Sequence, residues 1–300
     1  MDPIYSKISS NKRRTFFLFF LYALLFGGIG LLIGEFMGEP ILGIILAAVI
    51  FVILFLVSYF GGQGVVTSMA GAREVSKQEE PFLYNTVEGL SFAAGKPMPK
   101  IYIIETEIPN AFAAGRNPDH AIIAVTRGLM KRLNRQELEG VIAHEMAHIN
   151  NYDVLLATVA IVLAGTIVFI SAIARRSLFF GRIGGGRRNN QGQIILLVIL
   201  IVVAILAPIF AQLLKFAISR QREYLADATA ADFTGYPEGL ASALEKITEQ
   251  QVENSPIDNQ ALAGLYIVNP ALGARSGRKA AALFSSHPPS EDRVRRLRAM

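Results

Sequence analysis

Two long apolar runs near the start of the sequence constrain this chain more than any other feature. The first extends from Thr15 to Ile33 and the second from Pro40 to Phe60, and neither contains a charged residue. Each run is close to the roughly 20 residues that an α-helix needs to cross the hydrocarbon core of a bilayer. A cleavable signal peptide is the alternative for the first run, but this run is longer than a signal core. We therefore expect a membrane-spanning helical hairpin.

The charges around this hairpin predict its orientation. The connection from Glu35 to Glu39 carries two acids and no base, whereas four bases precede the first run: Lys7, Lys12, Arg13 and Arg14. Because bases concentrate on the cytoplasmic side of membrane proteins, both ends of the hairpin should lie in the cytoplasm.

The composition agrees with a membrane protein and limits its chemistry. Hydrophobic residues make up 52% of the chain and charged residues 18%, and the mean hydropathy of +0.40 is high for a soluble protein. The absence of cysteine excludes disulfide scaffolds, cysteine hydrolases and thiolate zinc sites, so a metal site must use His, Asp or Glu. The net charge of +5 is typical of bases that flank membrane spans, and we expect no nucleic-acid partner.

Two further apolar runs, Val154 to Ala174 and Ile194 to Phe216, are also long enough to span. The connector 175–193 carries five arginines and no acid, and it would lie outside if both runs crossed, against the usual charge asymmetry. A hairpin that only dips into the membrane, or docks on the soluble domain, is the alternative. The expected division is 1–62, first hairpin; 63–152, first part of a soluble domain; 153–217, second hairpin; and 218–300, second part of that domain.

The soluble part 63–152 contains strand and helix signals. Lys100 to Glu105 and Ala121 to Thr126 are rich in β-branched residues and bounded by Pro, Asn and Gly, which indicates strands of a small sheet. Asn134 with Glu137 three residues later predicts a capped helix start.

That helix contains the motif His144-Glu145-Met146-Ala147-His148. Positions i and i+4 of a helix share one face, so both imidazoles can bind a zinc ion from one side. Glu145 lies about 100° around the helix from His144, which suits a general base that activates a zinc-bound water. A helix with solvated His and Glu side chains is the simpler alternative.

A catalytic zinc needs a third protein ligand. Glu223 is the best candidate, and Asp227 shares its helix face at i+4. Asp227 would accept the N–H of a ligating imidazole and so fix its tautomer. A solvated helix face with arginines and acids is the alternative for this segment.

Several segments accompany the HEMAH motif in a fixed order. PNAFA (109–113) and VTRGL (125–129) precede it, and NNYD (150–153), SRQREYLAD (219–227) and HPP (287–289) follow it. This set resembles the HtpX branch of the membrane zinc proteases related to the CAAX prenyl protease. The resemblance implies a mainly α membrane protein with four apolar helices and an α+β zincin-like (gluzincin) protease domain with a small β-sheet.

The resemblance also implies roles for individual residues. One zinc ion per chain would be bound by His144, His148 and Glu223, with Glu145 as base and Asp227 as the supporting carboxylate. Asn110 would line the substrate cleft, where an extended substrate could pair as an added strand, and His287 would lie near the cleft as an oxyanion donor.

The implied function is membrane protein quality control during stress. A plasma (inner) membrane, multi-pass endopeptidase with a cytoplasmic protease domain would cut unfolded or damaged membrane proteins, with the lipid bilayer as its other partner. A catalytically silent zinc-binding adaptor is the main alternative, although such a protein has no use for Glu145. An intramembrane protease is disfavoured by the polar motif helix, and a transporter by the lack of midplane charges or broken helices in the spans.

Simpler roles remain for several residues. Asn110 follows a proline and suits a turn, and His287 precedes two prolines at a rigid helix start. Asp153 could be a partner of the motif helix, but we expect it mainly as the N-cap of the third apolar helix. The last basic residues predict a solvated or lipid-facing face: Arg293, Arg295, Arg296 and Arg298.

Overall fold

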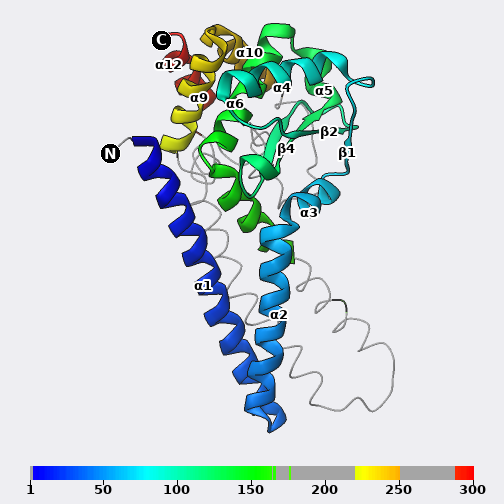
Figure 1. The fold of residues 1–300 in the computed structure, drawn as a ribbon, viewed down its shortest axis with the longest axis vertical. Coiled ribbons are helices and arrows are strands. Elements are labelled where there is room, and N and C mark those ends of the chain that lie inside the picture. Colours follow the sequence, from blue (N-terminus) through cyan, green and yellow to red (C-terminus); the bar gives the residue numbers. More distant parts are fainter. Residues whose placement is uncertain (1–2, 164, 167–175, 177–219, 251–287) are drawn as a thin grey trace.

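The computed structural model describes residues 3–163, 165–166, 176, 220–250 and 288–300. Within them, two long antiparallel helices project from a domain of helices and a small sheet (Figure 1). These helices are α1 (Pro3–Met37) and α2 (Pro40–Phe60). Together they form the hairpin predicted from the two apolar runs.

The hairpin is closed at its tip and open toward the domain. An added Cβ on Gly43 of α2 would come within 2.7 Å of the Gly34 Cα of α1, so glycines permit the close approach. Toward the domain, α1 and α2 diverge, and the helical segment Asp153–Leu163 lies between them (Figure 1). Phe19 of α1 and Val159 of that segment belong to one buried apolar cluster. The outer faces of both helices expose large apolar side chains, as lipid contact requires.

Two of the four expected apolar helices are found among the described residues. Asn11–Glu35 within α1 and Pro40–Phe60 are each long and apolar enough to cross a membrane. A third candidate exists only if Arg135–Asn150 and Asp153–Leu163 count as one span, and these two helices meet at 87°. The expected run 154–174 is described in part, and the run 194–216 lies outside the described residues.

The sheet has four described strands in the order β1-β2-β4-β3. Strand β2 (Lys100–Ile104) pairs parallel with β4 (Ala121–Thr126), which confirms both predicted strands. Strands β1 (Ala72–Glu74) and β3 (Ala111–Gly115) pair antiparallel to them at the two edges and were not predicted. The short segment η1 (Pro118–His120) connects β3 to β4.

Both faces of this sheet are covered, which explains why β4 is buried along its whole length and apolar up to Thr126. Ile123 and Val125 belong to the core shared with the motif helix, whereas Ile122 and Ala124 alternate to a second cluster. The helices around the sheet are α3 (Gly62–Met69), α4 (Pro81–Ala94), α5 (Arg127–Arg132), α6 (Arg135–Asn150), α9 (Arg220–Thr234), α10 (Pro237–Gln250) and α12 (Ser290–Leu297).

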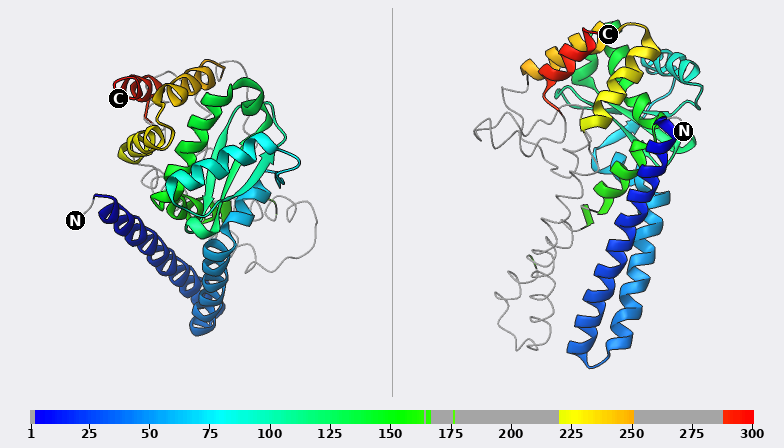
Figure 2. Two further views of the ribbon diagram at one scale, coloured as in Figure 1. Left: turned by 45° about the horizontal axis from the view of Figure 1, so that its top comes forward. Right: turned by 90° about the vertical axis from the view of Figure 1, so that its left-hand side faces the viewer.

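Helix α6 is the centre of the domain and begins as predicted. The Asn134 side chain accepts the Glu137 N–H at 3.0 Å, and the Glu137 carboxylate accepts the Asn134 N–H at 2.9 Å, which completes a capping box. Helices α9, α10 and α12 gather beside α6 (Figure 2). A Cβ on Gly140 would lie 2.6 Å from the Leu240 backbone N of α10, so only glycine allows this approach of the two helices.

Candidate metal centre

Three predicted ligands converge from two helices. Helix α6 contributes His144 and His148, and their Nε2 atoms lie 3.2 Å apart. Helix α9 contributes Glu223, whose two carboxylate oxygens lie 3.6 Å from the Nε2 atoms of His144 and His148 respectively. The i, i+4 spacing and the packing of α9 on α6 thus bring together the residues that the sequence indicated.

The spacing of these atoms fits a single metal ion. Tetrahedral zinc with bonds of about 2.0–2.1 Å separates its ligand atoms by about 3.3 Å. The distance of 3.2 Å between the two Nε2 atoms and that of 3.6 Å from each of them to one Glu223 oxygen are close to this value, and one ligand atom from each residue lies within 4.8 Å of the others. Two imidazole lone pairs that face each other beside a carboxylate are a suitable donor set for a divalent cation.

A carboxylate supports each imidazole from behind. The Asp227 Oδ1 atom lies 3.0 Å from the Nδ1 of His144, and the Asp153 Oδ2 atom lies 3.1 Å from the Nδ1 of His148. A proton on each Nδ1 would be donated to these acceptors, which leaves both Nε2 lone pairs for a metal. The structure places Asp227 as predicted. Asp153 was expected mainly as a helix N-cap, with partnership to the motif helix as the alternative, and the structure shows its contact with His148 of that helix.

Arg293 is the residue of the site that the sequence interpretation misplaced. It was expected on a solvated or lipid-facing basic face, but its side chain is 1% exposed. Its Nε and Nη2 atoms donate to the two oxygens of Asp227 at 2.9 and 2.6 Å. One signal could have found it, since Arg293 and the buried Leu297 lie at i and i+4 on the inner face of α12.

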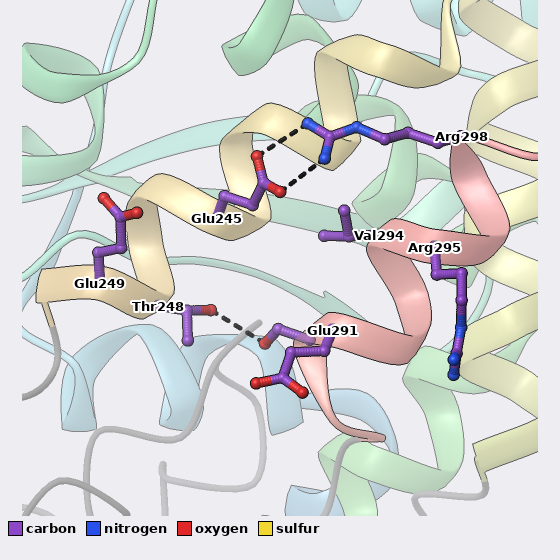
Figure 3. Close-up of a pocket in the computed structure, with 8 residues that line it drawn as sticks. Glu245, Thr248, Glu249, Glu291, Val294, Arg295 and Arg298 are labelled. Carbon is purple, nitrogen blue, oxygen red and sulfur yellow. Dashed lines mark hydrogen bonds and ion pairs between the residues drawn. The ribbon is translucent and has the colours of Figure 1, made fainter.

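Contacts with α10 fix helix α12 in the position from which Arg293 reaches Asp227. Arg298 pairs with Glu245 at 2.7 Å, and the Thr248 hydroxyl lies 2.9 Å from the Ser290 hydroxyl (Figure 3). These side chains line a pocket between the two helices, away from the buried side of α12 that faces the histidines.

The buried charges shift one another's protonation. Burial and Arg293 lower the pKa of His144, but hydrogen bonds with Asp227 and Glu223 outweigh them and raise it to about 9. Burial raises the pKa of Asp227, but the opposite effect of Arg293 and His144 is larger, and the pKa is lowered to about 2. Asp227 is therefore ionised at neutral pH, and a metal ion must displace a proton from His144 to bind.

The remaining predicted residues have different outcomes. Glu145 is buried in α6 beside His144, and its charge contributes to raising the pKa of the buried Arg293, against the effect of burial. Asn110 is buried at the start of β3, where its side chain accepts the Ala111 N–H at 3.0 Å. This contact is local, with the adjacent backbone N–H, and the role of Asn110 in the cleft stays a prediction. His287 lies outside the described residues.

Comparison with known proteins identifies the family. Residues 77–300 match the model of Peptidase family M48. The chain belongs to peptidase family M48. It is therefore a metalloprotease, a hydrolase that acts on peptide bonds.

Relatives within M48 support the predicted resemblance to HtpX. A Protease HtpX homolog of Dictyoglomus thermophilum is 47% identical, over 99% of this chain and 94% of its own. A Protease HtpX homolog of Streptococcus gordonii is 43% identical, over 99% of this chain and 100% of its own. The crystal structure of S. mikatae Ste24p has a TM-score of 0.49 and 18% identity, over 98% of this chain and 67% of that one. With the two apolar helices, the two HtpX homologs indicate a membrane protease of the HtpX type.

Proposed function

We propose that the protein is a membrane-anchored zinc endopeptidase with His144, His148 and Glu223 as ligands of one zinc ion. The convergence of one ligand atom from each of the three residues within 4.8 Å of one another, with a carboxylate behind each histidine, carries this proposal. Two histidines from an HExxH helix and a glutamate from a following helix form the ligand set of a gluzincin-type site.

The chain's own residues suit hydrolysis by an activated water. Zinc bound here would act as a Lewis acid and bring the pKa of its water near 7. Glu145, buried next to His144, would take the proton of the attacking water and return it to the leaving amine. Asp227, held ionised by Arg293, would keep the proton of His144 on Nδ1 so that Nε2 faces the metal.

The substrates we propose are unfolded or damaged membrane proteins at the cytoplasmic face of the plasma membrane. The bases in the first turns of α1, before its apolar run, support this orientation, because they should stay in the cytoplasm. Strand β3 is an edge strand of the described sheet and contacts α6. An extended substrate segment could add to this edge beside Asn110, and a segment of any sequence could do so, since main-chain hydrogen bonds provide most of the affinity.

The test compares purified full-length protein in detergent with Glu145→Gln and with Glu139→Gln, a control on the same helix. Zinc content and cleavage of casein are measured, with and without a chelator. We expect all three proteins to bind one zinc ion and only Glu145→Gln to lose cleavage. Zinc binding without cleavage by the wild type would favour the silent adaptor, and absence of zinc would contradict the ligand assignment.

A further inference from the structure

The first apolar helix contacts the turn that follows the motif helix. The Asn11 side chain of α1 donates from Nδ2 to Asp153 Oδ1 at 2.7 Å and lies 3.4 Å from the Asn151 carbonyl. The next residue, Lys12, places its Nζ 5.0 Å from the centre of the Tyr152 ring. Two consecutive residues of α1 thus contact all three residues of the turn 151–153, about 140 positions later in the chain.

This turn is the element that brings Asp153 to His148. The two oxygens of the Asp153 carboxylate have different partners, because Oδ1 accepts from Asn11 and Oδ2 faces the Nδ1 of His148 at 3.1 Å. Asn11 and Asp153 are 4% and 7% exposed. A buried carboxylate keeps its position and charge only where donors satisfy its oxygens. Asn11 therefore satisfies Oδ1, the Asp153 oxygen that His148 does not contact.

A third helix joins the same cluster. Arg222 of α9, adjacent in sequence to the ligand Glu223, lies 3.5 Å from Asp153 Oδ1 and donates to Asn11 Oδ1 at 3.4 Å. These partners also define the orientation of the Asn11 amide, since Asp153 requires a donor and Arg222 an acceptor. The cluster connects α1, the turn after α6 and α9 around the metal ligands.

The turn itself depends on outside support. Tyr152 has a φ of 59°, in the left-handed region that a bulky side chain rarely adopts. Such a conformation persists where surrounding contacts hold it in place. Here α1 provides contacts on both sides of Tyr152 and on its ring.

We propose that Asn11 is a positioning residue for His148, acting through Asp153, so that the membrane helix α1 is a component of the metal centre as well as an anchor. Asn11 is also the first residue of the apolar span within α1, which places this contact where the span meets the domain. The inference rests on the proposed zinc site, because it concerns how one ligand of that site is oriented.

The test uses the full chain in detergent and compares Asn11→Ala with Tyr22→Phe. Tyr22 donates its hydroxyl proton to the Leu163 carbonyl at 2.9 Å, so both changes remove a buried hydrogen bond between α1 and the helical segment Asp153–Leu163. Of these two residues, only Asn11 contacts Asp153. The zinc dissociation constant is measured by competition with a chelating dye. We expect Asn11→Ala to weaken zinc binding about tenfold, as for outer partners of metal ligands, and Tyr22→Phe to leave it unchanged.

Two further variants separate positioning from general destabilisation. Asn11→Asp keeps the shape of the side chain but replaces the donor by an oxygen facing Asp153. Its zinc affinity should therefore also fall by at least about tenfold. Asp153→Asn alone should weaken zinc binding, and adding Asn11→Ala to it should cause no further loss, because the two residues act in one pathway.

Specific outcomes would overturn the inference. Equal losses in Asn11→Ala and Tyr22→Phe would show that α1 only contributes packing. Unchanged zinc binding in Asn11→Ala, or additive losses in the double variant, would show that Asn11 does not act through Asp153. Failure of the wild type to bind zinc would overturn the proposed zinc site, and this inference with it.

Discussion

Arg293 binds Asp227 through two hydrogen bonds, of 2.9 and 2.6 Å, across 66 residues of sequence. Asp227 in turn faces the Nδ1 of His144 at 3.0 Å. The last described helix thereby acts on His144, a proposed metal ligand of α6, through a residue of α9. A planar guanidinium that meets both carboxylate oxygens fixes the orientation of that carboxylate as well as its charge.

Removing Arg293 should destabilise the domain. Arg293→Ala would leave Asp227 buried without its cationic partner, which costs about 3–5 kcal/mol of the free energy of unfolding. Arg293→Lys would keep the charge and lose the paired geometry, so its peptidase activity should fall with a smaller loss of stability. Thermal unfolding in detergent and casein cleavage provide the measurements. Arg295→Ala, with a side chain 78% exposed on the same helix, should change stability by no more than about 0.5 kcal/mol. Equal melting of Arg293→Ala and Arg295→Ala would contradict this role of Arg293.

Asp227 should tune metal binding without being a ligand. Asp227→Asn removes the charged acceptor for His144, so zinc affinity should fall about 10–100-fold. Glu223→Gln changes a proposed ligand itself, so zinc affinity should fall further in this variant. Competition with a chelator of known affinity measures both. An unchanged affinity in Asp227→Asn would mean that Asp227 does not orient the imidazole.

The capping box of α6 should make stability depend on pH. Burial raises the pKa of Glu137, but hydrogen bonds from Lys246, Ser242 and the Asn134 backbone lower it below its ordinary value of 4.5. A carboxylate with a lowered folded-state pKa stabilises the fold above its unfolded pKa, and this contribution is lost as the pH falls through the folded-state pKa. Glu137→Gln should therefore lower the free energy of unfolding by about 1–2 kcal/mol at pH 7.

The difference between Glu137→Gln and the wild type should be smaller at an acidic pH that protonates the wild-type carboxylate than at pH 7. Chemical unfolding at both pH values measures it, with Glu139→Gln on the same helix as the control. A difference that stays constant with pH would show that the charge of Glu137 is unimportant.

Helix α6 should tolerate no side chain at position 140, where its backbone meets that of α10. In Gly140→Ala the new Cβ would lie 2.6 Å from the Leu240 N and 2.9 Å from its Cα. Backbone atoms cannot rotate away, so the helices must separate, at a cost of about 1–3 kcal/mol. Gly89→Ala in α4 is the matched control, because its Cβ meets nothing within 4 Å, and it should be neutral or stabilise by up to about 1 kcal/mol. Thermal unfolding of both variants measures the difference in stability. Similar melting temperatures would contradict the close packing.

Several elements of this protein could be predicted because their signals are local. The helix cap at Asn134 and the stacked histidines depend on spacings of three and four residues along one helix. The hairpin depends on the length of two apolar runs. Strands β1 and β3 escaped prediction because short edge strands obtain their hydrogen bonds from neighbours distant in sequence.

The sequence by itself determined the ligand types, their helical spacing and the membrane hairpin, since each is encoded within one segment. Only the tertiary structure decided which distant residues surround the candidate metal centre. The sequence around Arg293 is that of a surface helix, and Asn11 lies in a polar, basic stretch just before the first apolar run, so neither pattern indicates a role at the site. Their partners lie 66 and 142 positions away in the chain. Such contacts exist only after packing brings α1, α6, α9 and α12 together.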